Sequence, residues 1–265
     1  MRDLLATDIS GEAVLIGKVK NVVGAGLCGT LLGISGVYAD TATKGEAVAD
    51  NFWTFKLTPS YYVTTHTKDA IDLNLRANYG PHAIWLGHYR RDSEFEQTRS
   101  GYEYTAQISF VQLVPSLQLA SRGFVGGSIN AQIGDEIYAL LGFGRTNLRD
   151  YYNLNFDPND SILYGLGTTL LPKSTISLYT IKDDRLATGQ AVTHVFWHMV
   201  PNDQQRWSVD LSSKHGRANA YGEYVSGNAL TVTYDYRGKF FRLAKDRKVN
   251  FTTEDQTRLT VGLRF

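Results

Sequence analysis

The chain ends in the stretch Thr257-Arg258-Leu259-Thr260-Val261-Gly262-Leu263-Arg264-Phe265. Its odd-numbered positions are mostly apolar, and its even-numbered positions are polar or small, so the hydrophobic pattern has a period of two. Successive side chains of a β-strand point to opposite faces, and this segment therefore predicts a strand with one apolar and one polar face. The segment also ends on an aromatic residue.

The same alternation returns along the chain from residue 51 onward, for example in residues 71–79, 102–110, 207–212 and 230–237. The segments run to about 10 residues, which suits a transmembrane β-strand tilted by about 45°. Aromatic residues gather near segment ends, as at Trp53, Phe55 and Tyr61. The second face carries charges, which the dry core of a soluble sandwich would not tolerate. We therefore expect a membrane barrel that encloses a wet interior.

Short turn signals alternate with longer polar connections. The short signals are Gly80-Pro81, Val114-Pro115, Gly134-Asp135, Leu171-Pro172-Lys173, Pro201-Asn202-Asp203 and Arg237-Gly238, and the longer connections are 65–68, 91–100, 124–127, 146–160, 183–188, 215–228 and 249–255. Bacterial barrels have short periplasmic turns and longer external loops. Six turns and seven loops predict an all-β, antiparallel up-and-down barrel of fourteen strands. If residues 116–133 form one hairpin arm or a bulged strand, the count becomes twelve.

Residues 1–39 have the pattern of a cleavable signal peptide. An uncharged stretch over residues 21–39 follows Lys18 and Lys20 and ends in Val37-Tyr38-Ala39, with small residues three and one before the expected cut. An amphipathic N-terminal helix is the alternative interpretation. Residues 40–50 would then be a short periplasmic segment, and residues 51–265 the barrel. The one cysteine, Cys28, lies in the leader, so the barrel needs no disulfide.

The charge balance excludes one class of function. The 27 Lys and Arg residues nearly equal the 26 Asp and Glu residues, which gives a net charge of +1. A protein that binds nucleic acid electrostatically needs a surplus of cations to displace counterions. After residue 40 there is also no apolar run long enough for a transmembrane helix.

In the leader that ends at Ala39 and in the last strand that ends at Phe265, the chain resembles bacterial outer-membrane β-barrel proteins. The resemblance implies a place in the bacterial outer membrane, in contact with its lipids and lipopolysaccharide. It also implies that the barrel-assembly machinery recognises the last strand through Leu259, Val261, Leu263 and Phe265. Short fragments are similar to YaiO-type barrels, namely Arg90-Arg91-Asp92, Leu171-Pro172-Lys173 and Arg264-Phe265.

The polar faces supply candidate solute-binding residues. The residues expected to face the lumen are Lys56, Asp72, Arg76, Glu103, Asp210, Lys214, Asp235, Arg237, Arg258 and Arg264. Mixed signs argue against strong ion selectivity, because selective pores use rings of one sign. On residues 82–89 we expect the face with Trp85 and Tyr89 to meet lipid. Inward glycines at 142, 144, 165 and 167 leave room for the connection 146–160 to fold inward, for a ligand, or for curvature.

One set of residues is a candidate for catalysis. Asp210 and Ser212 share a strand face, and His215 follows shortly after. A hydroxyl near an imidazole and a carboxylate is the pattern of an activated nucleophile, although an ordinary lumen wall explains it equally. The chain has no Gly-x-Ser-x-Gly elbow. His194 and His198 would lie roughly 13 Å apart along a strand, too far to share one metal ion. We expect neither a metal nor a cofactor.

Three functions remain open at this point. The first is a small monomeric porin-like channel or binding barrel for small polar solutes. The second is an outer-membrane enzyme that modifies lipid A or phospholipid, and the third is a structural or surface-interaction barrel without catalysis.

Overall fold

The computed structural model describes residues 52–155 and 157–265. The expected signal peptide at 1–39 and the segment at 40–50 lie outside the described residues. Among the residues described, no helix has the length and apolar character required to cross a membrane.

The described chain is almost entirely β-structure. Its strands are β1 (Thr54–Thr64), β2 (Ala70–Tyr79), β3 (His82–Arg91), β4 (Phe95–Tyr104), β5 (Ala106–Ile108), β6 (Val111–Ala120), β7 (Phe124–Gly134), β8 (Ile137–Thr146), β9 (Ser161–Thr168), β10 (Ser174–Asp183), β11 (Ala191–Asn202), β12 (Gln205–Arg217), β13 (Tyr224–Tyr236), β14 (Lys239–Asp246) and β15 (Gln256–Arg264). Two 3₁₀ turns, η1 (Ser121–Gly123) and η2 (Val249–Phe251), lie in connections. Only Thr105 separates β4 from β5, so these two segments act as one strand of the barrel.

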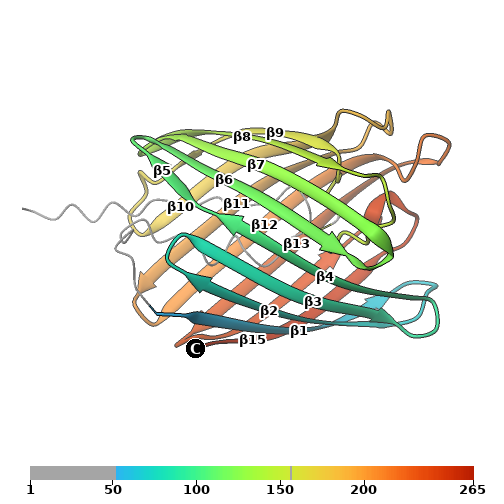
Figure 1. Cartoon of the computed structure of the whole chain (residues 1–265), viewed down its shortest axis with the longest axis horizontal. Coiled ribbons are helices and arrows are strands. Elements are labelled where there is room, and N and C mark those ends of the chain that lie inside the picture. Colours follow the sequence, from blue (N-terminus) through green and yellow to red (C-terminus); the bar gives the residue numbers. More distant parts are fainter. Residues whose placement is uncertain (1–51, 156) are drawn as a thin grey trace, which may run out of the picture.

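The sheet closes on itself, and fourteen strands cross the barrel (Figure 1). Neighbours in sequence pair antiparallel, β4 also pairs with β6, and the first strand β1 pairs with the last strand β15. At that seam Phe55 and Phe265 exchange two backbone hydrogen bonds of 2.6 and 3.0 Å. The prediction of a closed antiparallel barrel of fourteen strands is confirmed, and twelve is excluded.

The two faces of the strands differ as the sequence predicts. On β15, Leu259, Val261 and Leu263 point outward, and Val261 is 57% exposed. Arg258 and Thr260 point inward and are buried, with Thr260 1% exposed. Exposed leucine, isoleucine and valine side chains cover the outside of the other strands in the same way. The outer surface is therefore an apolar band, as in membrane barrels.

Aromatic side chains ring the end of the barrel that carries the short turns and Phe265. Trp53 lies 5.2 Å from Tyr79, measured between ring centroids, and Phe55 stacks on Phe265 at 5.6 Å. Further along this rim Trp207 lies 4.3 Å from Tyr234. Such a girdle is typical of the membrane–water interface of a barrel. The longer connections leave the opposite end (Figure 1).

Two connections lie elsewhere than predicted. The turn expected at Val114-Pro115 lies at Ser109-Phe110, and Pro115 is inside β6. Proline lacks an N–H and is tolerated in a sheet only where no ladder bond is required. Val114 and Pro115 are the two β6 residues between the part paired with β4 and the part paired with β5, where the partner strand is interrupted.

The connection expected at 124–127 lies at Ser121–Gly123, and β7 already begins at Phe124. Arg122 and Gly123 have φ values of 68° and 76°, so the backbone reverses there in the left-handed region. The ring of Phe124 points inward and stacks on Tyr151. This long-range contact fixes the start of the strand, and no local pattern could reveal it.

The predicted orientation of β3 is wrong. Trp85 and Tyr89 are 6% and 1% exposed and point inward, whereas Ile84 and Leu86 are exposed outside with His82 at the strand end. Both faces of this strand are largely apolar, so alternation alone cannot choose between them. A Cβ atom on Gly101 of β4 would overlap the ring of Trp85, so glycine at this position makes the inward placement of the indole possible.

We predict that Leu259→Arg lowers the free energy of unfolding by about 2–4 kcal/mol, because it places a cation near the middle of the hydrocarbon. Leu263→Arg, nearer the end of the same strand face, should cost less. Chemical unfolding of the purified barrel in lipid vesicles measures both values. An equal cost at the two positions, or a larger cost at Leu263, would contradict the assignment of this face to lipid.

Candidate functional site: the barrel interior

Inward-pointing charges occupy one half of the barrel circumference. They come from β12 to β15 and from β1 to β4, and include Lys56, Asp72, Arg76, Arg99, Glu103, Asp210, Lys214, Asp235, Arg242, Asp246, Arg258 and Arg264. The inward faces of β6 to β11, which we call the uncharged wall, carry no Lys or Arg in the described strands. Their single inward carboxylate is Asp183, at the loop end of β10. The lumen therefore has a charged side and an uncharged side.

On the charged side, four carboxylates each contact a cation on another strand. Arg76 donates to Glu103 at 2.6 Å, and the other pairs are Arg99 with Asp72, Lys214 with Asp246 and Arg264 with Asp235. Seven of the eight predicted lumen residues in the solute-binding set lie on this inner face. The four ion pairs offset part of the cost of removing their charges from bulk water.

Arg237 is the eighth, and its predicted place in the lumen is wrong. It is exposed in the turn between β13 and β14, where its Nε donates to Gln204 Oε1 at 3.1 Å. Arg237 and Gly238 have φ values of 53° and 77°, which is the backbone of a tight hairpin turn. Strand β13 ends one residue too early to turn this guanidinium inward.

At the short-turn end, three cations surround one aromatic ring. Lys56 Nζ lies 5.3 Å from the centroid of Phe240, and the guanidinium carbons of Arg242 and Arg264 lie 5.7 and 4.9 Å from it. The phenyl ring covers Gly262 of β15, where a Cβ would overlap it. Arg242 was not among the predicted lumen residues, although Phe240, Arg242, Ala244 and Asp246 alternate with Phe241, Leu243 and Lys245 along β14.

The described residues of the connection between β8 and β9, 147–155 and 157–160, fold into the barrel near its long-loop end. Gln97 makes two hydrogen bonds to the backbone of this connection. Its Nε2 donates to the Asp150 carbonyl at 3.2 Å, and its Oε1 accepts from the Tyr152 N–H at 3.1 Å. The ring of Tyr152 stacks on Tyr89 at 4.7 Å. The inward fold of this connection, one of the predicted options, is confirmed.

The far part of the same connection reaches β11 and β12. The two ring nitrogens of His194 lie 3.2 Å from Asp157 Oδ1 and 3.1 Å from Asp210 Oδ1. The Leu154 carbonyl accepts from Arg258 of β15 at 3.4 Å. The connection thus crosses the lumen and contacts both sides of it.

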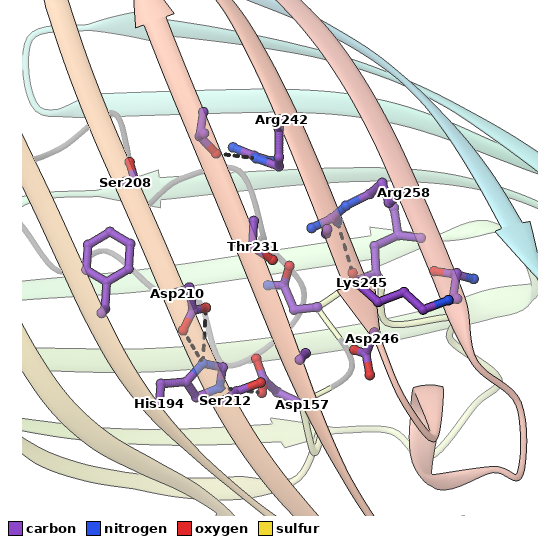
Figure 2. A pocket seen from close by; sticks show the side chains of 17 residues that line it. Asp157, His194, Ser208, Asp210, Ser212, Thr231, Arg242, Lys245, Asp246 and Arg258 are labelled. Atoms are coloured by element: carbon purple, nitrogen blue, oxygen red, sulfur yellow. Dashed lines mark hydrogen bonds and ion pairs between the residues drawn. The ribbon is translucent and has the colours of Figure 1, made fainter.

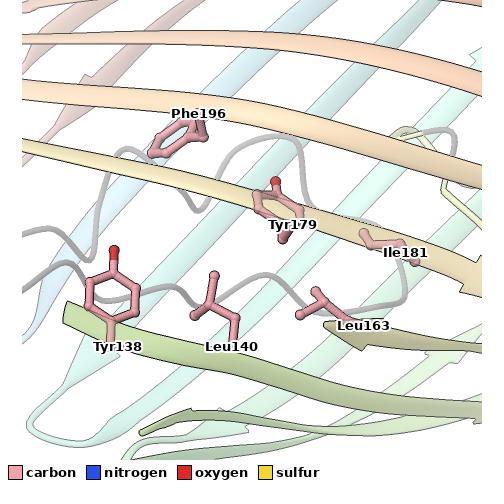
Figure 3. Packing of buried hydrophobic residues seen from close by; sticks show 6 residues of the cluster. All are labelled: Tyr138, Leu140, Leu163, Tyr179, Ile181 and Phe196. Carbon is pink, nitrogen blue, oxygen red and sulfur yellow. The ribbon is translucent and has the colours of Figure 1, made fainter. Parts of the chain in front are cut away.

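The inward glycines of β9 do not make room for this connection. A Cβ on Gly167 would overlap the ring of Tyr138, and a Cβ on Gly165 would overlap Tyr179 and the backbone of β10. Figure 3 shows Tyr138 and Tyr179 with Leu140, Leu163, Ile181 and Phe196, which form an apolar cluster on the uncharged wall. Gly167 accommodates the ring of Tyr138, and Gly165 allows the backbone of β10 at Leu178 and Tyr179 to lie close.

A small cavity lies between the inward connection and the charged side (Figure 2). Its volume is about 70 Å³, and its lining includes His194, Asp210, Thr231, Arg242 and Arg258. A water molecule occupies about 30 Å³ of liquid volume, so the cavity has room for about two waters. Its polar lining makes it a hydrated part of the lumen rather than a packing defect.

The proposed catalytic set does not assemble. Asp210 and Ser212 point inward, whereas His215 is exposed on the outer face of β12 with its ring near Tyr224. Side chains an odd number of residues apart lie on opposite faces of a strand, so Ser212 and His215 cannot meet. The histidine that faces Asp210 is His194, and both its nitrogens already face carboxylates.

Metal ligands are not grouped in the described part of the chain. His194 and His198 both point inward, as predicted, but no cluster of three or more His, Cys, Asp or Glu side chains there is suited to a metal ion.

No protein-family model matches the chain, and no curated protein matches it. Solved structures are similar in shape. The outer membrane protein Omp33 of Acinetobacter baumannii has a TM-score of 0.52 at 8% sequence identity, over 80% of this chain and 98% of that one. The KdgM porin has a TM-score of 0.45 at 10% identity over 79% and 99%, and the NanC porin 0.46 at 9% over 79% and 98%. The similarity to Omp33 shows that the chain has an outer-membrane β-barrel fold.

We predict that Gln97→Ala loosens the connection 147–160 without unfolding the barrel. It removes two hydrogen bonds to the backbone of the connection, each with a net value of about 0.5–1.5 kcal/mol. Amide hydrogen exchange in residues 150–154 should therefore become about tenfold faster. Gln132→Ala, at another buried glutamine on β7, is the matched control and should leave that exchange unchanged. Equal exchange in both variants would show that Gln97 does not hold the connection.

Proposed function

We propose that this chain, which folds as an outer-membrane β-barrel, is a small monomeric porin-like channel or binding barrel for small polar solutes. The observation that carries the proposal is the division of each strand into an apolar outer face and a polar inner face within a closed sheet. A barrel of fourteen strands is wider than eight-strand barrels filled by side chains, and narrower than sixteen-strand porins with an aqueous channel.

The outer surface supports a place in the bacterial outer membrane. Its apolar band and the aromatic girdle at the short-turn end suit contact with lipids and lipopolysaccharide. The last strand presents Leu259, Val261, Leu263 and Phe265 outward, where a barrel-assembly machinery could reach them before closure. These partners form part of the proposal.

The interior suits small solutes. Residues 147–160 cross the lumen and reduce its free cross-section near the long-loop end. A solute in the lumen would exchange its hydration water for hydroxyl, amide and charged groups on the walls, which act as hydrogen-bond donors and acceptors. Because most carboxylates there contact cations, the lumen favours hydrogen bonding over strong binding of free ions.

The lipid-modifying enzyme has no comparable support. Asp210 and Ser212 face the lumen and not the lipid, and His215 lies on the other side of the sheet. A nucleophile for lipid chemistry would have to reach the outer surface or its rim.

We predict discrete conductance steps when the purified barrel is inserted in planar lipid bilayers. Replacing residues 149–158 by a short Gly-Ser linker should raise the step size, because it removes the segment that crosses the lumen. Folding of both proteins is checked by the heat-dependent shift in gel mobility that closed barrels show. Folded protein that stays silent in both forms would contradict the channel, and equal steps would contradict the role of the connection.

A further inference from the structure

A groove lies on the outer, lipid-facing surface of the barrel, over the seam where β1 meets β15 (Figure 1). Its volume is about 550 Å³, within the range of about 300–1,000 Å³ that is typical of ligand pockets. The lining comes mainly from the outward faces of four neighbouring strands and includes Leu57 and Pro59 of β1, Tyr234 of β13, Phe241 of β14, and Val261 and Leu263 of β15. The groove therefore offers an apolar chain more contact than a flat surface would.

The pairing of the seam is interrupted at this groove. In the described strands, β1 and β15 pair at Leu57–Leu263 and again at Ser60–Thr260, but neither Thr58 nor Pro59 pairs with β15. Proline has no N–H to donate to a neighbouring strand. A molecule that lies in the groove would contact both β1 and β15, and so would help to hold the two ends of the sheet together.

Two cations lie at the end of the groove nearer the short turns. Lys239 of β14 is exposed, points outward and lines the groove. In the register Lys239 is directly opposite Tyr236 of β13. The guanidinium carbon of Arg237, which is also exposed, lies 5.2 Å from the centroid of the same tyrosine ring. One aromatic residue is thus flanked by an ammonium and a guanidinium group.

The position of the groove along the barrel suits a phospholipid. Tyr234, which lines it, belongs to the aromatic girdle through its contact with Trp207, and such a girdle marks the membrane–water interface. Lys239 lies nearer the turns, at the depth of the headgroups. Phe241 and its register partner Val261 lie about 7 Å further along the strands toward the hydrocarbon. The groove therefore runs from headgroup depth into the membrane.

We propose that this groove is a binding site for one phospholipid, whose phosphate contacts Lys239 and Arg237 and whose acyl chain lies in the groove. The inference rests on the proposed place in the outer membrane, because it gives one lipid a defined position there. Basic side chains attract anionic headgroups and bind phosphate by charge-assisted hydrogen bonds. Lipid tails are as apolar as the side chains they contact, so the phosphate supplies the preference for this lipid and the groove fixes its chain by close packing.

Native mass spectrometry of the folded barrel in detergent counts bound lipids, with dioleoylphosphatidylglycerol and dioleoylglycerol as probes. The two have the same acyl chains, but only the first has a phosphate. One molecule of the phospholipid should stay bound, about tenfold more tightly than dioleoylglycerol. Glycerol phosphate, which has no acyl chain, should not displace it at equal concentration. Equal affinities for the two lipids, displacement by glycerol phosphate, or many equivalent bound lipids would overturn the proposal.

Two variants test the contact with the phosphate. Lys239→Gln and Arg237→Gln should each weaken binding of the phospholipid by about fivefold and leave that of dioleoylglycerol unchanged. Lys245→Gln is the matched control, because Lys245 is an outward lysine of the same strand that lies outside the groove, near the long-loop end. If Lys245→Gln weakens binding as much as Lys239→Gln, the barrel attracts anionic lipids only in general, and the site is wrong.

A third variant tests the groove itself. Val261→Phe should weaken binding of both lipids, because the larger side chain fills the space for the acyl chain. Val63→Phe makes the same change on the outer face of β1, outside the groove, and should alter neither affinity. The heat-dependent shift in gel mobility checks that both variants are folded. An equal effect of the two variants, or a dimer that only Val261→Phe dissociates, would contradict the lipid site.

The lipid assay does not require conduction, so the two proposals can fail separately. A barrel that conducts but retains no phospholipid contradicts only the lipid site. A barrel that retains one phospholipid as described but stays silent in bilayers supports the site and contradicts the channel.

Discussion

Every backbone N–H and C=O group in hydrocarbon must find its hydrogen-bond partner within the protein, and the rest of this structure depends on that constraint. An open sheet would leave two edges unpaired in the membrane, so the sheet has to close. It does so where β1 meets β15, with Phe55 and Phe265 bonded through their backbones, and where β6 pairs with the interrupted strand β4 and β5. Closure then separates the side chains into an outer set that meets lipid and an inner set that faces the lumen.

The inner set shows how a lumen can hold charges and aromatic rings together. Each ion pair spans one intervening strand, from β2 to β4 or from β12 to β14, so charge is offset locally along the charged side. Bulky rings lie over glycines of an adjacent strand, as Trp85 does over Gly101 and Phe240 over Gly262. The glycines therefore make space for specific side chains. The result is a lumen with a charged side and an uncharged wall.

Local alternation predicts much of this architecture, because the period of a strand is a local property. The faces of β15 follow from it, and the total of fourteen strands follows from the turn signals between the strands. The features that the sequence did not predict depend on contacts between residues far apart in the chain. Pro115 is accepted within β6 only because the partner strand breaks opposite it, and Trp85 points inward only because Gly101 leaves room for it. Arg237 lies just past the end of β13, and His215, which was expected at the start of a connection, lies inside β12. The contact of His194 with Asp157 requires an inward loop, whose path no spacing specifies.

The central claim is that the apolar face of the strands touches lipid and the polar face does not. Nitroxide labels on cysteines introduced one at a time from residue 258 to residue 263, with Cys28 replaced by serine, test it in vesicles through collisions with lipid-soluble oxygen. The account predicts high oxygen accessibility at Leu259, Val261 and Leu263 and low accessibility at Arg258, Thr260 and Gly262. Uniform accessibility along the strand, or the opposite alternation, would contradict it.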